Sequence, residues 1–151
     1  MMTTLIVVAV CVVDQLTKYW ITARFQVADS YPIVQGIFHL TYVRNTGGAF
    51  GMLRGWTPLL IVVSLLAIVV MLRVVQLRRA ATTRDHMTQC ALAGVLGGAL
   101  GNLVDRVRVG YVIDFLDFRV WPVFNVADSA ITIGAAMIIW DITFKMVKQK
   151  K

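Results

Sequence analysis

Three groups of polar side chains interrupt this largely apolar sequence at spacings that would let them interact. Asp14 and Lys18 are four residues apart in the first apolar run, and Asn102 and Arg106 are four apart at the end of a later one. Residues four apart lie on one face of a helix, so each pair can interact. Charged groups inside a membrane helix cost about 2.5–3.5 kcal/mol each on insertion scales, so we expect them to face a protein interior or a wet cavity.

The third group is a pair of carboxylates, Asp114 and Asp128, with a short connection between them. Asp114 lies in an apolar run, and Asp128 is followed by twelve residues without a charge. The connection can bring both carboxylates together at a membrane surface. Two neighbouring carboxylates cannot both ionise readily, so one keeps a proton. Such a pair can act as base toward water and as acid toward a leaving amine, which is the chemistry of aspartic peptide hydrolysis.

Each group also has a plainer interpretation. Lys18 could extend outward while Asp14 only neutralises it, and we favour a structural role for this pair. Asp105 beside Arg106 could form a solvated ion pair, whereas an inward Arg106 could orient a carboxylate or a backbone group. Asp128 could cap the helix that it begins, or relay protons in a transporter.

Composition indicates an integral membrane protein. Of the 151 residues, 58% are hydrophobic and only 15% are charged, which is too few polar residues to cover a soluble domain of this content. The net charge of +7 is attributed to Lys and Arg at the flanks of membrane spans, not to a nucleic-acid partner. The two cysteines lie in apolar runs and suggest neither a disulfide framework nor a metal site.

Four apolar stretches predict four transmembrane helices, at approximately 5–22, 56–74, 86–104 and 124–144. Between the first two, residues 36–43 have the β-branched and aromatic content of strands. Residues 105–121 are interpreted as a short polar connection, with Asp117 as a loop carboxylate and Asp141 at the cytoplasmic end of the fourth span. We therefore predict an all-α membrane protein of one domain, residues 1–151, with a small β-rich cradle between helices 1 and 2.

Two further patterns concern packing and orientation. Gly94, Gly97, Gly98 and Gly101 form two overlapping G-x-x-x-G pairs, which we interpret as close helix contacts in lipid before any functional role. Basic residues are dense in residues 73–84 and in the C-terminal tail. Because such residues collect on the cytoplasmic side, we predict that both segments and both termini are cytoplasmic.

The polar motifs together resemble the bacterial lipoprotein signal peptidase (signal peptidase II) family of aspartic endopeptidases. They follow the order of that family over almost the whole chain. One departure is Gly48, where Ala or Val is more usual. The motifs are Asp14-x-x-x-Lys18, Asn45-Thr46-Gly47-Gly48-Ala49-Phe50, Gly98-x-x-Gly101-Asn102-x-x-Asp105-Arg106, Val112-Ile113-Asp114-Phe115 and Phe124-Asn125-Val126-Ala127-Asp128-Ser129.

The resemblance implies a four-helix inner-membrane protease with cytoplasmic termini and an extracytoplasmic cradle and active site. It implies cleavage of diacylglyceryl-modified prolipoproteins on the amino side of the lipidated cysteine, with Asp114 and Asp128 as the catalytic pair. It implies lipid-modified prolipoproteins and membrane lipids as partners of a monomer, and no metal or organic cofactor. It assigns substrate-binding or supporting roles to Asp14, Lys18, Asn45, Gly98, Asn102, Arg106 and Asn125.

The residues themselves allow some refinement. Asn45 and Asn102 could hydrogen-bond a substrate backbone, and Arg106 could balance the negative charge of the carboxylate pair. A presenilin-like protease would carry a G-x-G-D pattern, which is absent from this sequence. The alternative outside the proteases is a small proton-coupled transporter or channel subunit using intramembrane Asp residues, but no repeat relates the two halves of the chain.

Overall fold

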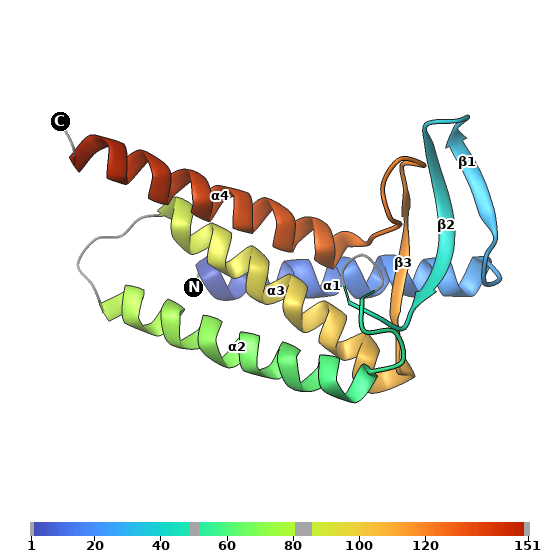
Figure 1. Ribbon diagram of the computed structural model, residues 1–151, viewed down its shortest axis with the longest axis horizontal. Coiled ribbons are helices and arrows are strands. Elements are labelled where there is room, and N and C mark those ends of the chain that lie inside the picture. The colour runs from blue at the N-terminus through green and yellow to red at the C-terminus, as the bar shows by residue number, and fades with distance from the viewer. Residues whose placement is uncertain (1, 49–51, 81–85, 150–151) are drawn as a thin grey trace.

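Four long helices form the body of the protein, and a small sheet lies at one end of them (Figure 1). The computed structural model describes residues 2–48, 52–80 and 86–149, without the side chains of 78–80 and 144–149. Residues 49–50 of the glycine-rich motif, residues 81–84 of the basic loop and Lys150 and Lys151 lie outside the described residues. The helices are α1 (Met2–Arg24), α2 (Thr57–Ala80), α3 (His86–Val109) and α4 (Val126–Gln149).

All four helices are long and apolar enough to cross a membrane, which confirms the four predicted spans. Each helix ends beyond its predicted span, because the polar residues that follow the apolar core continue the helix. Leu5, Leu66 and Ile139 are 71%, 61% and 65% exposed on the outer surface of the bundle. Apolar side chains are exposed along the helices in this way when lipid, not water, surrounds them.

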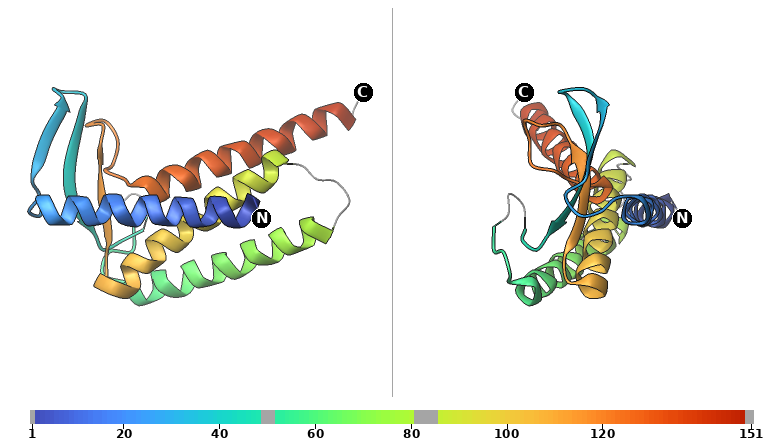
Figure 2. Two further views of the ribbon diagram at one scale, coloured as in Figure 1. Left: turned by 180° about the vertical axis from the view of Figure 1, so that it is seen from behind. Right: turned by 90° about the vertical axis from the view of Figure 1, so that its right-hand side faces the viewer.

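Helix α3 is the central helix. Half of its apolar span is buried, compared with 11% for α4 and 17% for α1 and for α2. It packs against the other three helices, which the two opposite views of the ribbon also show (Figures 1 and 2).

The two G-x-x-x-G pairs of α3 face different neighbours. At Gly98 an added Cβ would collide with the carbonyl oxygen of Ala127 in α4, and at Gly97 it would lie 2.9 Å from Cβ of Val10 in α1. At Gly101 it would lie 2.6 Å from a carboxylate oxygen of Asp14. The Gly94/Gly98 pair therefore lets α4 lie close to α3, and the Gly97/Gly101 pair lets α1 lie close to α3.

We expect Gly98→Ala to destabilise the protein by at least about 2 kcal/mol, because the methyl group must push the backbone of α4 away. The matched control is Gly94→Ala one turn earlier, where the nearest atom, the carbonyl oxygen of Ala130, would be 3.4 Å from the new Cβ. Thermal unfolding of both variants in detergent measures the difference. Equal midpoints would contradict the close α3–α4 approach at Gly98.

The sheet has three antiparallel strands in the order β1 (Ser30–Val34), β2 (Phe38–Asn45) and β3 (Val112–Asp117). The predicted strand region between α1 and α2 is confirmed as the hairpin of β1 and β2. Ile21 of α1, Tyr42 of β2 and Phe115 of β3 form the buried apolar cluster beneath the sheet. This cluster attaches the sheet to the end of α1.

The interpretation of residues 105–121 as a polar connection is wrong. Helix α3 continues to Val109, and Val112–Asp117 forms β3, which pairs with β2 so that Val43 lies opposite Asp114. The sheet thus joins a segment between α3 and α4 to the hairpin between α1 and α2. Asp117 ends this strand and is 4% exposed, so it is not the loop carboxylate that we expected. Asp141 lies within α4 and is also buried.

Candidate active site

Asp114 and Asp128 line one cavity of about 850 Å³ at the sheet end of the helices. We call it the carboxylate cavity. Asp114 comes from β3 and is 2% exposed, whereas Asp128 lies in the first turn of α4 and is half-buried. Other lining residues come from α2, α3 and the connection between β3 and α4, and most of them are apolar. The structure therefore brings the two carboxylates together at the end of an apolar groove.

Asn125 links the two carboxylates. Its side-chain Nδ2 donates to Asp114 Oδ1 at 2.7 Å, and its Oδ1 accepts from the backbone N–H of Asp128 at 2.8 Å. Asp128 Oδ2 in turn accepts from the backbone N–H of Asn125 at 3.3 Å. Asn125 is therefore the N-cap of α4, and Asp128 completes a capping box from the third helical position. This capping contact uses Oδ2 of Asp128.

The second oxygen of Asp128 is held by Asn102. Asn102 Nδ2 donates to Asp128 Oδ1 at 2.7 Å, while its own Oδ1 accepts from Lys18 Nζ at 3.0 Å and from Asn125 Nδ2 at 3.1 Å. Because the lysine can only donate, Oδ1 of Asn102 must face Lys18, and its Nδ2 must face Asp128. Lys18 thus fixes the orientation of Asn102 and, through it, that of Asp128.

Asp114 has an unusually high pKa for an aspartate. Burial is the largest cause and the charge of Asp128 the second, and together they raise the pKa of Asp114 from 3.8 to about 7. Hydrogen bonds from Asn45 and Asn125 and the charge of Lys18 act in the opposite direction. Asn45 Nδ2 donates to Asp114 Oδ2 at 2.9 Å. A proton is therefore available on this carboxyl near neutral pH.

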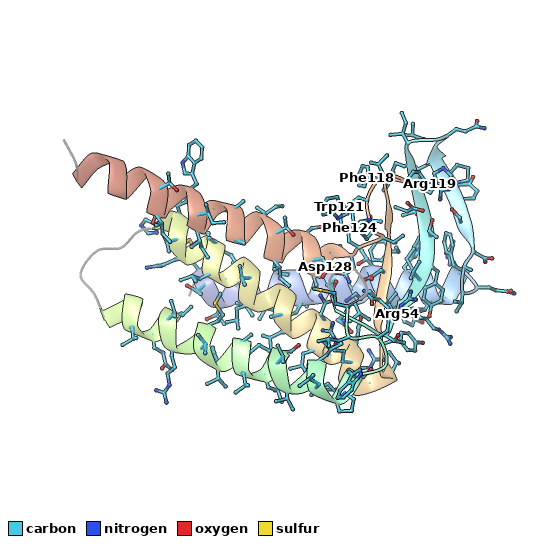
Figure 3. The ribbon with its side chains drawn as sticks, in the orientation of Figure 1. Arg54, Phe118, Arg119, Trp121, Phe124 and Asp128 are labelled. Atoms are coloured by element: carbon cyan, nitrogen blue, oxygen red, sulfur yellow. The ribbon has the colours of Figure 1, made fainter. Side chains whose placement is uncertain are left out.

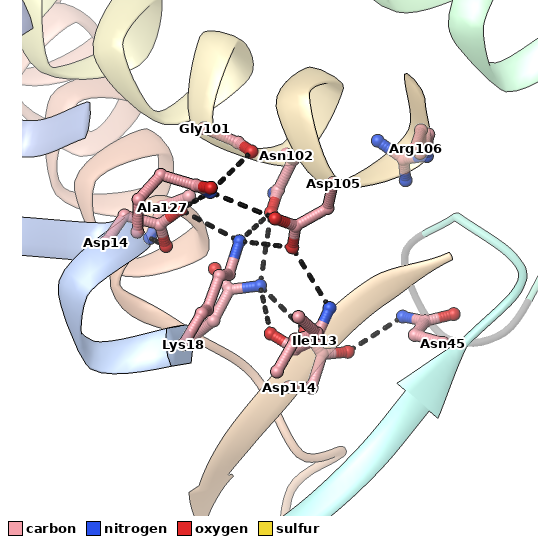
Figure 4. A network of polar contacts seen from close by, with 12 residues as sticks. Asp14, Lys18, Asn45, Gly101, Asn102, Asp105, Arg106, Ile113, Asp114 and Ala127 are labelled. Atoms are coloured by element: carbon pink, nitrogen blue, oxygen red, sulfur yellow. Dashed lines mark hydrogen bonds and ion pairs between the residues drawn. The ribbon is translucent and has the colours of Figure 1, made fainter. Parts of the chain in front are cut away.

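Lys18 lies at the centre of a buried polar network (Figure 4). It is 1% exposed, and its ammonium group lies 2.8 Å from Asp14 Oδ2 and 2.8 Å from Asp105 Oδ2. With Asn102 as third acceptor, all three N–H donors of the lysine have partners. Asp14 Oδ1 also accepts the backbone N–H of Ala127 at 2.9 Å, which ties α1 to the first turn of α4.

Asp105 belongs to this network, although it was absent from the predicted site residues. It is 2% exposed and pairs with Lys18 in place of a solvated pair with Arg106. Its oxygens also accept from Gln15 Nε2 at 2.9 Å and from the backbone N–H of Ile113 at 3.1 Å. The available sequence signal was its position three residues after Asn102, on the same side of a helix that proves to extend to Val109.

Asn45, Asn102 and Arg106 all line the carboxylate cavity. The two asparagines donate to Asp114 and Asp128. Their expected contacts with a substrate backbone stay a prediction. Arg106 Nη2 donates to the carbonyl oxygen of Gly47 at 3.2 Å. Of the two alternatives for Arg106, the structure contains the inward orientation toward a backbone group. Gly98 contributes a close helix contact and no side chain.

Aromatic side chains form a wall of the cavity next to Asp128 (Figure 3). Phe118, Trp121 and Phe124 lie on the connection from β3 to α4, and Phe118 and Phe124 stack with ring centroids 5.9 Å apart. Trp121 is 58% exposed. These aromatic residues were not among the predicted site residues, because the sequence of a Pro-containing connection does not indicate which of its rings face a cavity.

Comparison with known proteins decides the family. A family model described as signal peptidase (SPase) II matches residues 6–144, nearly the whole chain. The chain belongs to the signal peptidase II family. It is accordingly a protease, and the reading as a transporter or channel subunit is not favoured.

Related proteins support this assignment at good coverage. A lipoprotein signal peptidase of Halothermothrix orenii is 44% identical over 135 residues, which are 89% of this chain and 90% of that protein. One of Caldanaerobacter subterraneus is 44% identical over 146 residues, covering 95% and 97%. A solved bacterial membrane enzyme is 32% identical and superposes with a TM-score of 0.86, covering 99% of this chain and 92% of that one.

Proposed function

We propose that this protease removes signal peptides from diacylglyceryl-modified prolipoproteins by cleaving on the amino side of the lipidated cysteine. Asp114 and Asp128 would be its catalytic residues. The observation that carries the proposal is the shared cavity at the end of an apolar groove. There the side chain of Asn125 donates to the carboxylate of Asp114, and its backbone N–H donates to that of Asp128. The names of the relatives supply the class of substrate.

The carboxylate pair can perform hydrolysis with one shared proton. The ionised carboxylate takes a proton from water as the water oxygen attacks the scissile carbonyl carbon, and the protonated carboxyl donates to the carbonyl oxygen. When the C–N bond breaks, the proton taken from water passes to the leaving amine, and a hydroxyl proton of the intermediate returns to the other carboxylate, which restores the pair. The raised pKa of Asp114 supports a role as the proton holder. Asp14, Lys18, Asn102 and Asn125 would position the pair, and water is the only reactant besides the substrate.

The rest of the cavity suits a substrate held in lipid. Val63 and Ala67 of α2 and Ile131 of α4 line it on the side of the membrane spans. An apolar signal peptide and two acyl chains could lie against such a surface while the scissile bond reaches the carboxylates. The extended backbone near the bond would need polar partners away from water.

The test compares two synthetic substrates of the same sequence, one with a diacylglyceryl group on its cysteine and one without. Purified protein in lipid nanodiscs should cleave only the lipidated peptide at an appreciable rate, with the new amino terminus at the lipidated cysteine. Equal cleavage of both peptides would refute lipid recognition and leave a general peptidase. The products are identified by mass spectrometry.

We expect the activity to fall as the pH rises through about 7, because the pair then loses its single proton. Asn45→Ala removes a hydrogen bond that stabilises the ionised form of Asp114, so this alkaline limb should move to higher pH. Ser30→Ala, on the exposed hairpin, is the control and should leave the limb in place. An alkaline limb that moves to lower pH in Asn45→Ala would contradict the assigned role of Asp114.

The same raised pKa has a consequence for stability. The folded protein keeps a proton on Asp114 that the unfolded chain releases near pH 4, the ordinary range of an aspartate. The extra proton binding of the folded state contributes to the free energy of unfolding. This stabilisation is fully present below about pH 4 and is lost as the pH rises toward about 7.

We further propose that the protein lies in the bacterial inner membrane with both termini cytoplasmic and the sheet outside. The start of α1, the end of α2, the start of α3 and the end of α4 all lie away from the sheet (Figure 1). In a background of Cys11→Ala and Cys90→Ala, we expect Gln35→Cys to react with an impermeant thiol reagent in intact cells, and Gln76→Cys and Lys148→Cys to be protected. Labelling at position 148 would show that the protein has the opposite orientation.

We also predict that the protein is a monomer formed by one peptidase domain, residues 1–151.

A further inference from the structure

A second cavity, of about 500 Å³, lies behind the sheet from the carboxylate cavity. The two cavities take opposite faces of β3, since Ile113 lines the second cavity whereas Val112 and Asp114 line the first. Residues of α1, α3 and β2 complete the second cavity, including Arg44 and Arg108. We call it the arginine cavity. The proposed reaction uses none of its exposed residues.

The two arginines of this cavity have no carboxylate partner among the residues that the structure describes. Arg44 is exposed, and its guanidinium lies 4.9 Å from the ring centroid of Tyr111 and 5.9 Å from that of Tyr42. Its Nε donates to Tyr42 Oη at 3.3 Å. Arg108 is also exposed and contacts Gln15 Oε1 at 3.4 Å. The aromatic rings and the glutamine thus hold two cations in place without neutralising them.

Among the residues that the structure describes, one acid lines this cavity, and it already has a cationic partner. Asp105 forms the inner wall, where it is 2% exposed and paired with Lys18. The exposed rim is therefore positive, with two guanidinium groups that can bind oxygens of a phosphate through paired N–H donors.

The cavity lies at the ends of two membrane spans, α1 and α3, where we expect the headgroup region of the bilayer. It lies between the sheet-side ends of α1 and α3, and Tyr19 is one of its lining residues. Tyr19 is 73% exposed and lies near the end of its span, where interfacial aromatic residues are common. Farther into the membrane, Leu16 of α1 and Val104 of α3 are exposed to lipid tails. A soluble anion would gain nothing from these apolar neighbours, whereas acyl chains would contact them.

We propose that the arginine cavity binds the phosphate of an anionic phospholipid, such as phosphatidylglycerol, through Arg44 and Arg108. Bound lipid would bridge β2 and α3 on the face of the sheet opposite the carboxylate pair. Neither arginine belongs to the proposed catalytic network.

The test is a lipid titration of the purified full chain in detergent, followed by native mass spectrometry. Phosphatidylglycerol should bind about 25-fold more tightly than phosphatidylcholine, since each of the two arginines near a headgroup changes affinity by about fivefold. Arg44→Gln and Arg108→Gln should each weaken phosphatidylglycerol binding by about fivefold, and the double variant should bind both lipids alike. Arg24→Gln is the matched control, because Arg24 also lies over an aromatic ring, 5.5 Å from that of Trp20, but outside the cavity.

Three results would overturn the proposal. Equal affinity of the unaltered protein for the two lipids would do so without any variant. A loss in Arg24→Gln as large as in the cavity variants would show that charge alone, and not this cavity, attracts the lipid. Displacement of phosphatidylglycerol by an equal concentration of inorganic phosphate would assign the cavity to a soluble anion.

Discussion

Replacing either Asp114 or Asp128 by Asn should abolish turnover, lowering the rate by a factor of at least about 10³. Asn is nearly isosteric with Asp, but an amide neither takes a proton from water nor shares one with a carboxylate. Because the two groups act on one proton, the double variant should be little slower than either single variant. Cleavage of the lipidated peptide by the three variants measures this.

The comparison requires that the variants still fold and still bind the substrate. The apolar groove is untouched, so the lipidated peptide should still bind. Asp29→Asn is the matched control, because Asp29 is exposed and accepts a hydrogen bond from the backbone N–H of Gln26 at 2.7 Å, which an amide oxygen can also accept. Additive losses, with the double variant far slower than both singles, would contradict a shared proton.

Lys18→Met should destabilise the protein by about 3–5 kcal/mol, the second large effect that we expect. The substitution removes the only cation that contacts Asp14 and Asp105 within the described residues, and both carboxylates are buried. Neutralising one of them should restore part of the loss, so Lys18→Met with Asp105→Asn should be more stable than Lys18→Met alone. Thermal unfolding in detergent reports the order of the variants.

The control for this series is Arg24→Gln, which removes a positive charge from the exposed end of the same helix. Its effect on stability should lie within about 0.5 kcal/mol. If Lys18→Met were as stable as Arg24→Gln, the ion pairs of Lys18 would contribute nothing, and the network could not be what orients Asn102. A double variant less stable than Lys18→Met would contradict the charge argument in the same way.

Much of this architecture follows from local patterns in the sequence. Long apolar runs specify the four helices, and the spacing of Asp14 and Lys18 predicted a contact that the structure contains at 2.8 Å. The glycine pairs predicted close packing, and α3 indeed approaches α1 and α4 at these positions. Such features depend on helical periodicity, which can be read from one segment at a time.

The features that the sequence did not reveal depend on pairing between distant segments. Val112–Asp117 forms a strand because it pairs with the edge of β2. The sequence of this short segment between two spans does not indicate that distant partner. Asp105 is buried because β3 covers the end of α3, where its carboxylate accepts the backbone N–H of Ile113. Its apparent partner in the sequence, Arg106, turns instead toward Gly47.

The most direct measurement of the central claim is hydrolysis of the lipidated peptide in water enriched in heavy oxygen. Water attack should place one heavy oxygen in the new carboxylate of the released signal peptide, with the other product beginning at the lipidated cysteine. Folded Asp128→Asn protein should yield neither product at an appreciable rate. Cleavage by that variant at a near-normal rate would contradict the aspartic mechanism and leave Asp128 as a residue of the helix cap.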